Sequence, residues 1–296
     1  MSAPDVPDAD TPFAAVCIPV RGDAARLQRC LAHLAAQDWP SDHLQVVVAV
    51  DGPDPDAEKV ARDAGVDVVV LPTPSGSYAA RNAALDALRD EISVVAFTDA
   101  DCMPAPGFVR AHVAALAGEA ALSGGAVEIT LRDRPSPAEF LDSIVHLQQQ
   151  STVEIQGYAA TANLAFRRAV IDELRFNSAL QTGGDVEICE RAARHGHRIV
   201  YTADAVVVHP ARQSIKAVAK KVWRICKGMP ARPERWVDRR FGPLLPVKQV
   251  LWPIARARRV GASGGLLWDV QLAVLIYARK LLIRASAYRV KRKARR

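Results

Sequence analysis

The chain is poor in cysteine, and its five cysteines are scattered at positions 17, 30, 102, 189 and 226. Their number is odd and no two form a C-x-x-C pair. That pattern argues against a disulfide framework and against a cysteine-based zinc site. The sequence therefore predicts reduced thiols in a cytosolic protein.

Long uninterrupted apolar runs are also missing. Residues 1–11 lack the basic and apolar regions of a secretory signal, and we expect 1–12 to be a flexible lead-in. The most hydrophobic stretch, 266–283, is interrupted by four polar or charged residues. It falls short of the roughly 20 mostly apolar residues that a membrane-spanning helix needs.

Acidic side chains are nearly absent from the end of the chain. Residues 211–296 hold 23 of the 39 Lys and Arg but only three Asp or Glu, a net charge of +20. The first 210 residues carry −13, from 16 basic and 29 acidic side chains. This asymmetry predicts an acidic catalytic or binding body joined to a basic segment that meets an anionic surface.

Valine-rich apolar runs alternate with helical patterns over the first 105 residues. Strands are expected at 13–19, 45–50, 67–71 and 94–101, with helices at 23–37, after Asp54 or Asp56, and at 78–88. This alternation indicates βαβ units around a parallel sheet covered on both faces, an α/β fold. Ligands bind beyond the carboxyl ends of such strands, so residues 19–21, Asp51 and residues 99–101 should share one edge.

The pattern changes after Pro106. Helices are expected at 108–116, 137–149 and 186–195, and strands or extended segments at 120–130, 158–166, 198–201 and 205–208. Gly124 and Gly125 mark a bulge or a close-approach point. Further on, 215–227 predicts a basic amphipathic helix, 232–240 a charged linker, and 244–252 an apolar segment that prolines interrupt.

Two carboxylates one residue apart, Asp99 and Asp101, end the fourth apolar run. In an extended segment alternate side chains share a face, so both should project together into solvent. They repel unless a cation, a donor or a proton compensates. Mg²⁺ or Mn²⁺ bound with a diphosphate would do so, because hard cations take carboxylate and phosphate oxygens. The alternative is a turn whose acids simply face water.

Seven short motifs follow one another between residues 13 and 212. They are Val16-Cys17-Ile18-Pro19, Val50-Asp51-Gly52, Ala79-Ala80-Arg81-Asn82, Asp99-Ala100-Asp101, the segment 162–168, Gly184-Asp185 and Val208-His209-Pro210. This ordered set resembles the family-2 glycosyltransferases. The resemblance implies a GT-A-type, Rossmann-like, mostly parallel sheet flanked by helices over 13–212. Its donor half would be 13–105 and its acceptor half 106–212, followed by a basic helical extension over 213–296.

The resemblance also implies roles at the donor end of the site. Asp99 would contact the nucleotide, while Asp101 and His209 would ligate a Mg²⁺ or Mn²⁺ that bridges the donor diphosphate. Further donor contacts are expected from Pro19, Val20, Arg21, Asp51, Arg81 and Ala100. Plainer explanations stay open: an Asp-Gly turn at Asp51, a solvated helix arginine at Arg81 and a structural histidine at His209.

Asp185 is the candidate general base. The family's Gly-Glu-Asp element reads Gly183-Gly184-Asp185 here, so the Asp is kept and the Glu is lost. A carboxylate facing the acceptor hydroxyl can take its proton as that oxygen attacks the anomeric carbon. Alternatively, Asp185 caps the following helix. Thr161, Asn163 and Gly184 are expected near sugar or acceptor, unless Asn163 only forms a turn.

The resemblance implies an inverting, metal-dependent, hexosyltransferase-like enzyme that takes sugar from a nucleotide-diphosphate donor, with a UDP-sugar favoured. A lipid-linked or glycan acceptor is expected, as in cell-envelope glycan synthesis. Transfer of a single sugar is expected because Arg235-Trp236 lacks the preceding Gln of the processive synthases. Two alternatives stay open: a nucleotidyltransferase on a related scaffold, and a non-catalytic lipid or nucleic-acid binding protein on a degenerate enzyme fold.

The basic extension has three interpretations: a packed or solvated surface, a nucleic-acid site, or a membrane-surface module. Tryptophan and tyrosine alternate there with basic and aliphatic residues, which favours an interfacial helix on anionic lipid. No nucleic-acid motif is visible, so no nucleic-acid partner is expected. We therefore expect residues 213–296 to bind peripherally at the inner face of the cytoplasmic membrane.

Overall fold

The computed structural model describes residues 11–228 and 247–294. The chain divides into two compact units, and each is described by itself. Unit 1 comprises Met1–Glu128 and Gln148–His209, and unit 2 comprises Ile129–Leu147 and Pro210–Arg296. The expected division into donor and acceptor halves at residue 105 stays a prediction.

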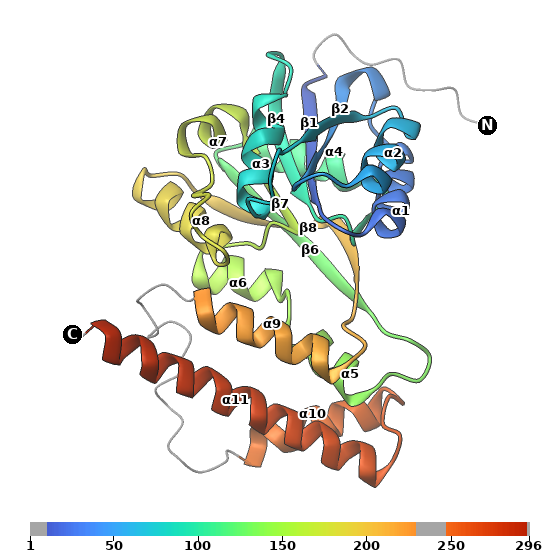
Figure 1. Ribbon diagram of the computed structural model, residues 1–296, viewed down its shortest axis with the longest axis vertical. Coiled ribbons are helices and arrows are strands. Elements are labelled where there is room, and N and C mark those ends of the chain that lie inside the picture. The colour runs from blue at the N-terminus through green and yellow to red at the C-terminus, as the bar shows by residue number, and fades with distance from the viewer. Residues whose placement is uncertain (1–10, 229–246, 295–296) are drawn as a thin grey trace. The chain divides into compact units, whose positions relative to one another are not determined.

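Strands and helices alternate along unit 1, as the sequence predicted (Figure 1). The strands are β1 Phe13–Val20, β2 Leu44–Val50, β3 Asp67–Val70, β4 Ile92–Thr98, β5 Met103–Pro104, β6 Leu122–Thr130, β7 Asn163–Arg167 and β8 Ile199–Pro210. The helices are α1 Ala24–Ala35, η1 Ser41–His43, α2 Pro55–Asp63, α3 Ser77–Asp86, α4 Phe108–Ala117, α6 Gln149–Gln156, α7 Arg168–Leu174 and α8 Gly184–Arg194. The α/β fold class is confirmed.

The described strands form one sheet in the order β3-β2-β1-β4-β7-β6-β8-β5. Neighbours run parallel from β3 to β4, and β7 then pairs antiparallel with both β4 and β6. Val20 pairs with Val50, and Cys17 with Phe97. The carboxyl ends of β1, β2 and β4 therefore meet at one edge, as expected.

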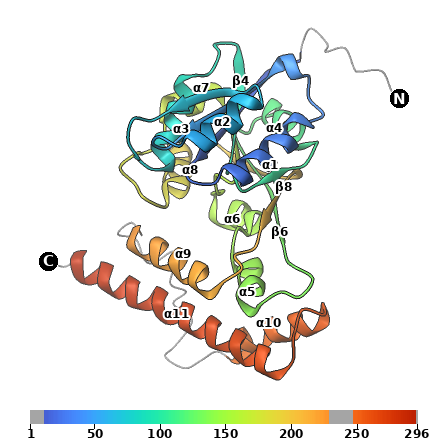
Figure 2. The same ribbon diagram turned by 45° about the vertical axis from the view of Figure 1, so that its right-hand side comes forward.

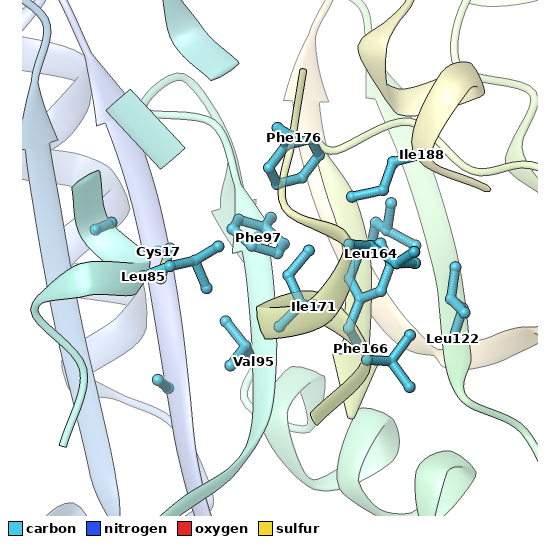
Figure 3. Close-up of a cluster of buried hydrophobic side chains, with 14 of the residues drawn as sticks. Cys17, Leu85, Val95, Phe97, Leu122, Leu164, Phe166, Ile171, Phe176 and Ile188 are labelled. Carbon is cyan, nitrogen blue, oxygen red and sulfur yellow. The ribbon is translucent and has the colours of Figure 1, made fainter. Parts of the chain in front are cut away.

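A large apolar core lies between the sheet and α3, α7 and α8 (Figure 3). Alternate residues of β4, Val95 and Phe97, enter this core, as the period-two pattern of a strand requires. Phe97 meets Phe166 and Phe176 edge to face, with ring centroids 6.0 and 5.0 Å away. The other face is covered by α1, α2 and α4 (Figure 1). The core thus fixes β4, whose end carries the aspartate pair.

Several predicted boundaries are wrong. β4 ends at Thr98 rather than at Asp101. The helix expected at 137–149 is two helices, because Leu147 adopts a positive φ of 50° between them. The two short strands expected near residue 203 are the single strand β8, where Thr202 bonds to Ser123 of β6 at 2.7 Å. Helix α7 and the short strand β5 were not predicted.

Unit 2 is mostly helical in its described residues. Its helices are α5 Pro137–Val145, α9 Ile215–Gly228, α10 Val247–Arg259 and α11 Leu266–Ala294, and both views show α11 running beside α10 (Figure 1 and Figure 2). Phe140 of α5 packs on Trp268 and Leu272 of α11 in a small core. The indole N–H of Trp268 donates to the Pro135 carbonyl at 3.0 Å. The expected linker 232–240 lies outside the described residues.

Within the described stretches, no helix combines the length and the hydropathy needed to cross a membrane. The basic amphipathic helix expected at 215–227 is confirmed as α9. Pro253, expected to interrupt the apolar segment, lies inside α10.

Candidate functional site

Asp99 and Asp101 lie in a turn after β4. The Cys102 N–H donates to the Asp99 carbonyl at 3.0 Å, which curls the backbone away from the strand direction. The prediction that both side chains share one face of an extended strand is therefore wrong. Each carboxylate instead has its own partner, and this relieves the repulsion between them.

Arg81 is the partner of Asp99. Its guanidinium nitrogen Nη2 lies 2.5 Å from Asp99 Oδ1, and the arginine side chain is 3% exposed. The guanidinium also lies over the rings of Tyr78 and Phe176, 5.8 and 6.0 Å from their centroids. Its buried Nε has no hydrogen-bond partner among the described residues. The alternative of a solvated helix arginine is wrong, because Arg81 is buried within the site.

Asp101 faces His209 of β8. Its Oδ2 lies 3.5 Å from His209 Nε2 and 3.8 Å from a guanidinium nitrogen of Arg26. One donor atom each from Asp101, Cys102 and His209 lies within 4.8 Å of the other two. A carboxylate oxygen and an imidazole nitrogen so placed fit Mn²⁺ or Mg²⁺ that also takes phosphate oxygens.

Cys102 is a member of this cluster that the sequence interpretation missed. Burial, and then the charges of Asp99 and Asp101, raise the pKa of its thiol well above its usual value. The thiol therefore stays protonated and is a poor ligand for a hard cation. Its position directly after the Asp-x-Asp element was the available signal.

Asp51 organises the loop that enters α3. Its carboxylate Oδ1 accepts from the Ser75 N–H at 2.6 Å and the Gly76 N–H at 3.0 Å. Gly52 follows at φ +91°, and a Cβ there would lie 2.8 Å from the ring of Pro74. The Asp-Gly turn is thus real, and Asp51 also stands at the end of β2 beside the site edge.

The other predicted donor residues lie at the same edge. Pro19 and Val20 end β1, Arg21 follows as an exposed side chain, and Ala100 is buried in the turn between the two aspartates. The N–H of Gly22 donates to Asp54 Oδ2 at 2.7 Å, which ties this turn to the start of α2.

Asp185 lies in the first turn of α8. The helix begins at Gly184 after Gly183, which has a φ of +79°, so the alternative that Asp185 caps the helix is wrong. Asp185 Oδ1 accepts from the Val186 N–H at 3.0 Å and lies 3.5 Å from the hydroxyl oxygen of Tyr78. An acid in the first turn is favoured by the helix dipole.

Tyr78 of α3 was not predicted as a site residue. Its hydroxyl accepts from the Gly184 N–H at 2.8 Å and donates toward Asp185. Burial, and then the charge of Asp185, raise the pKa of Tyr78, so the phenol stays protonated. A Cβ on Gly184 would lie 2.7 Å from the Tyr78 ring, which explains the glycine. The signal was an aromatic residue one turn before Arg81.

Asn163 does not reach the surface of the site. Its amide nitrogen donates to the carbonyls of Ala126 and Ala205, both at 2.7 Å, and its Oδ1 lies 2.8 Å from His112 Nε2. A Cβ on Gly125 would lie 2.3 Å from Asn163 Oδ1, so the close approach predicted at this glycine pair is confirmed. Asn163 thus joins strands inside the sheet, and neighbouring Thr161 is buried as well.

Sequence comparisons place the chain among glycosyltransferases. Residues 12–228 match the family described as Glycosyltransferase like family 2. The chain is 30% identical over 224 residues to glycosyltransferase AglE of Haloferax volcanii, with 73% of each protein covered. It is 26% identical over 220 residues to the pre-mycofactocin glycosyltransferase of Mycobacterium tuberculosis, covering 70% of this chain and 45% of that protein.

Solved glycosyltransferase structures have a fold similar to that of this chain. A mannosyltransferase, PcManGT from Pyrobaculum calidifontis in complex with GDP-Man and Mn²⁺, has a TM-score of 0.61 at 18% identity, covering 97% of this chain and 90% of that one. S. aureus TarS 1-349 in complex with UDP has a TM-score of 0.53 at 17% identity, covering 96% and 91%. These neighbours have the GT-A fold. The chain therefore belongs to glycosyltransferase family 2, and the protein is a glycosyltransferase with the GT-A fold.

Proposed function

We propose that this glycosyltransferase is inverting and metal-dependent, and that it moves a single sugar from a nucleotide-diphosphate donor to an acceptor hydroxyl. One relationship carries the proposal. Tyr78 and Arg81, one turn apart on α3, contact Asp185 and Asp99 respectively. A single helical turn thus links the candidate base to the aspartate expected to hold the nucleotide.

At the donor end, Asp99 and Asp51 would hold the nucleoside, with Arg81 orienting Asp99. Asp101 and His209 would hold a divalent cation, which when bound supplies Lewis-acid stabilisation of the departing diphosphate. A fold neighbour binds GDP-Man with Mn²⁺, and another binds UDP. These ligands support a nucleotide-sugar donor. We favour a UDP-sugar.

At the acceptor end, Asp185 would take the proton of the attacking hydroxyl. The hydroxyl oxygen then forms a bond to the anomeric carbon as the bond to the diphosphate oxygen breaks. A single displacement of this kind inverts the anomeric configuration. Tyr78 and Gly184 would keep the carboxylate facing the acceptor.

The acceptor is proposed to be lipid-linked or a glycan, as in cell-envelope glycan synthesis. The basic region 213–296 would hold the enzyme peripherally at an anionic membrane surface, on the inner face of the cytoplasmic membrane. Family membership favours sugar transfer over the nucleotidyltransferase alternative. The presence of Asp99, Asp101, Asp185 and His209 together in the sequence disfavours a non-catalytic binding protein on a degenerate enzyme fold.

Thermal unfolding with UDP or GDP, each with and without Mn²⁺ or Mg²⁺, tests the donor site. A ligand at 100 times its dissociation constant stabilises the native state by about 2.7 kcal/mol. We expect a rise in melting temperature that needs nucleoside diphosphate and metal together, and that Asp101→Asn abolishes. Asp63→Asn, at an exposed surface ion pair, is the matched control. Stabilisation only by nucleoside triphosphates, with pyrophosphate release, would instead favour nucleotidyl transfer.

A further inference from the structure

Helix α11 is apolar on two opposite faces. Trp268, Leu272 and Ile276 are buried and pack within unit 2. The other face carries five exposed residues, here called the outer stripe: Leu267, Val270, Val274, Tyr277 and Leu281. Their spacing of three and four residues places them in one line along the helix. The packing of unit 2 accounts for the first face and leaves the second unexplained.

The outer stripe is too exposed and too continuous to be incidental. Its side chains are between 41% and 74% exposed. Single exposed apolar residues are ordinary on protein surfaces, whereas a contiguous row of large ones marks a binding surface. Tyr277 adds an aromatic residue of the kind found where protein meets lipid headgroups.

The charges around the outer stripe are basic. Lys280 and Arg284 lie within one turn of it, and the sequence continues to Arg289–Arg296 with five further basic residues in the interval 291–296. Burial, and then the charges of Arg284 and Arg279, lower the pKa of Lys280. Crowded positive charge of this kind is relieved by an anionic partner.

Among the described residues of unit 2, the acidic side chains do not offset this charge at the surface. Three of them are buried in ion pairs: Glu139 with Arg132, Asp142 with Arg212, and Asp269 with Arg258. Arg132 lowers the pKa of Glu139 to about 2, so that pair persists at neutral pH. Among the described residues of unit 2, Asp133 is the remaining acid and is exposed. The surface formed by the described residues of unit 2 is therefore basic.

We infer that the outer stripe of α11 is a membrane-docking surface, which inserts between the headgroups and acyl chains of an anionic bilayer while flanking Lys and Arg contact lipid phosphates. This inference rests on the proposed membrane association and assigns it to one helix face. A second copy of the chain is the competing occupant. Pairing two such helices would bring basic flanks together, whereas an anionic surface complements them.

Co-sedimentation of the full chain with vesicles tests the assignment. The vesicles contain phosphatidylcholine alone or with added phosphatidylglycerol. We expect binding only with the anionic lipid, weaker at high salt. Leu267→Gln with Val274→Gln should reduce the binding constant at least about tenfold, because apolar area no longer leaves water. Ile155→Gln, at an exposed isoleucine of α6 in unit 1, is the matched control and should bind like wild type.

Equal vesicle binding by the double variant and the wild type would overturn the inference. Wild-type dimers in light scattering that the double variant loses, without vesicle binding, would assign the stripe to a second copy instead. Circular dichroism of the variants checks that they fold. Vesicle binding needs no sugar transfer, so stripe-dependent binding by a chain that releases no nucleoside diphosphate would refute the proposed function and leave the docking surface standing.

Discussion

The hydroxyl oxygen of Tyr78 lies 3.5 Å from Oδ1 of Asp185, with the Gly184 N–H donating to the same hydroxyl at 2.8 Å. Helix α3 thereby fixes the first turn of α8, although the two segments are about a hundred residues apart in the chain. The same turn of α3 carries Arg81, which bonds Asp99, so one helical turn contacts both the candidate base and the aspartate proposed to hold the nucleotide.

Tyr78→Phe should lower kcat about tenfold and leave the KM for the donor nearly unchanged. The phenylalanine ring keeps the packing but leaves the Gly184 N–H and Asp185 without the hydroxyl, at a cost of about 1–3 kcal/mol in unfolding free energy. Steady-state kinetics over a range of pH is the measurement, since a positioning role also alters the pH profile. Tyr201→Phe is the control. A variant with wild-type kcat and pH profile would show that Tyr78 does not position the base.

Arg81→Lys should raise the KM for the donor at least about tenfold and reduce stability. Lysine keeps the charge but cannot reproduce the planar guanidinium that bonds Asp99 while stacking on Tyr78 and Phe176. Arg62→Lys is the control, because its pair with Glu58 is an exposed i, i+4 pair on α2 worth only about 0.3–0.5 kcal/mol. Donor titration and urea unfolding measure both effects. If Arg81→Lys and Arg62→Lys have the same KM for the donor, Arg81 stabilises the fold and does not contribute to donor binding.

His112 makes the stability of unit 1 pH-dependent. Burial lowers the pKa of His112 from 6.5 to about 4, so the unfolded chain takes up a proton at pH 5 that the folded chain does not. Asn163 donates with its amide nitrogen, so its Oδ1 accepts from Nε2 and neutral His112 accepts from Ser123 at Nδ1. The stabilisation that neutral His112 contributes is therefore fully present above pH 6.5 and is lost as the pH drops toward 4.

Acidification from pH 7 to pH 5 should lower the free energy of unfolding by about 2 kcal/mol through the protonation of His112 in the unfolded chain. His112→Gln should be less stable at pH 7 yet lose less on acidification, whereas exposed His33→Gln should keep the wild-type slope. Urea unfolding at the two pH values is the measurement. The same slope in His112→Gln and wild type would assign the acid sensitivity to other groups.

Sequence patterns predicted those strands and helix starts that depend on residues close together in the chain. These patterns predicted the apolar strands β1, β2 and β3 and a helix start at Asp54 or Asp56, and the structure has Asp54 as the N-cap of α2. Strand patterns and helix caps depend on near neighbours. The gathering of three strand ends at one edge followed from parallel pairing. The family resemblance then assigned roles that no single motif could carry.

The misplaced features depend on contacts between distant segments. Asn163 was expected near the sugar, but its bonds to Ala126 and Ala205 bury it, and they form only when three strands meet. A solvated helix arginine was an open alternative for Arg81, because its partner Asp99 lies 18 residues further along the chain. Tyr78 lies 107 residues before Asp185 in the chain, and only the folded chain brings the two side chains together.

The most direct test of the central claim is acceptor-dependent release of nucleoside diphosphate by the wild type and by Asp185→Asn, with a nucleotide-sugar panel, Mn²⁺ and an extract of lipid-linked and glycan acceptors. Asparagine keeps the shape of the side chain but cannot take the acceptor proton. We predict release by the wild type, a loss of at least about a thousandfold in the variant, and donor binding unchanged between them. Wild-type turnover in Asp185→Asn, or pyrophosphate as the released product, would contradict the account.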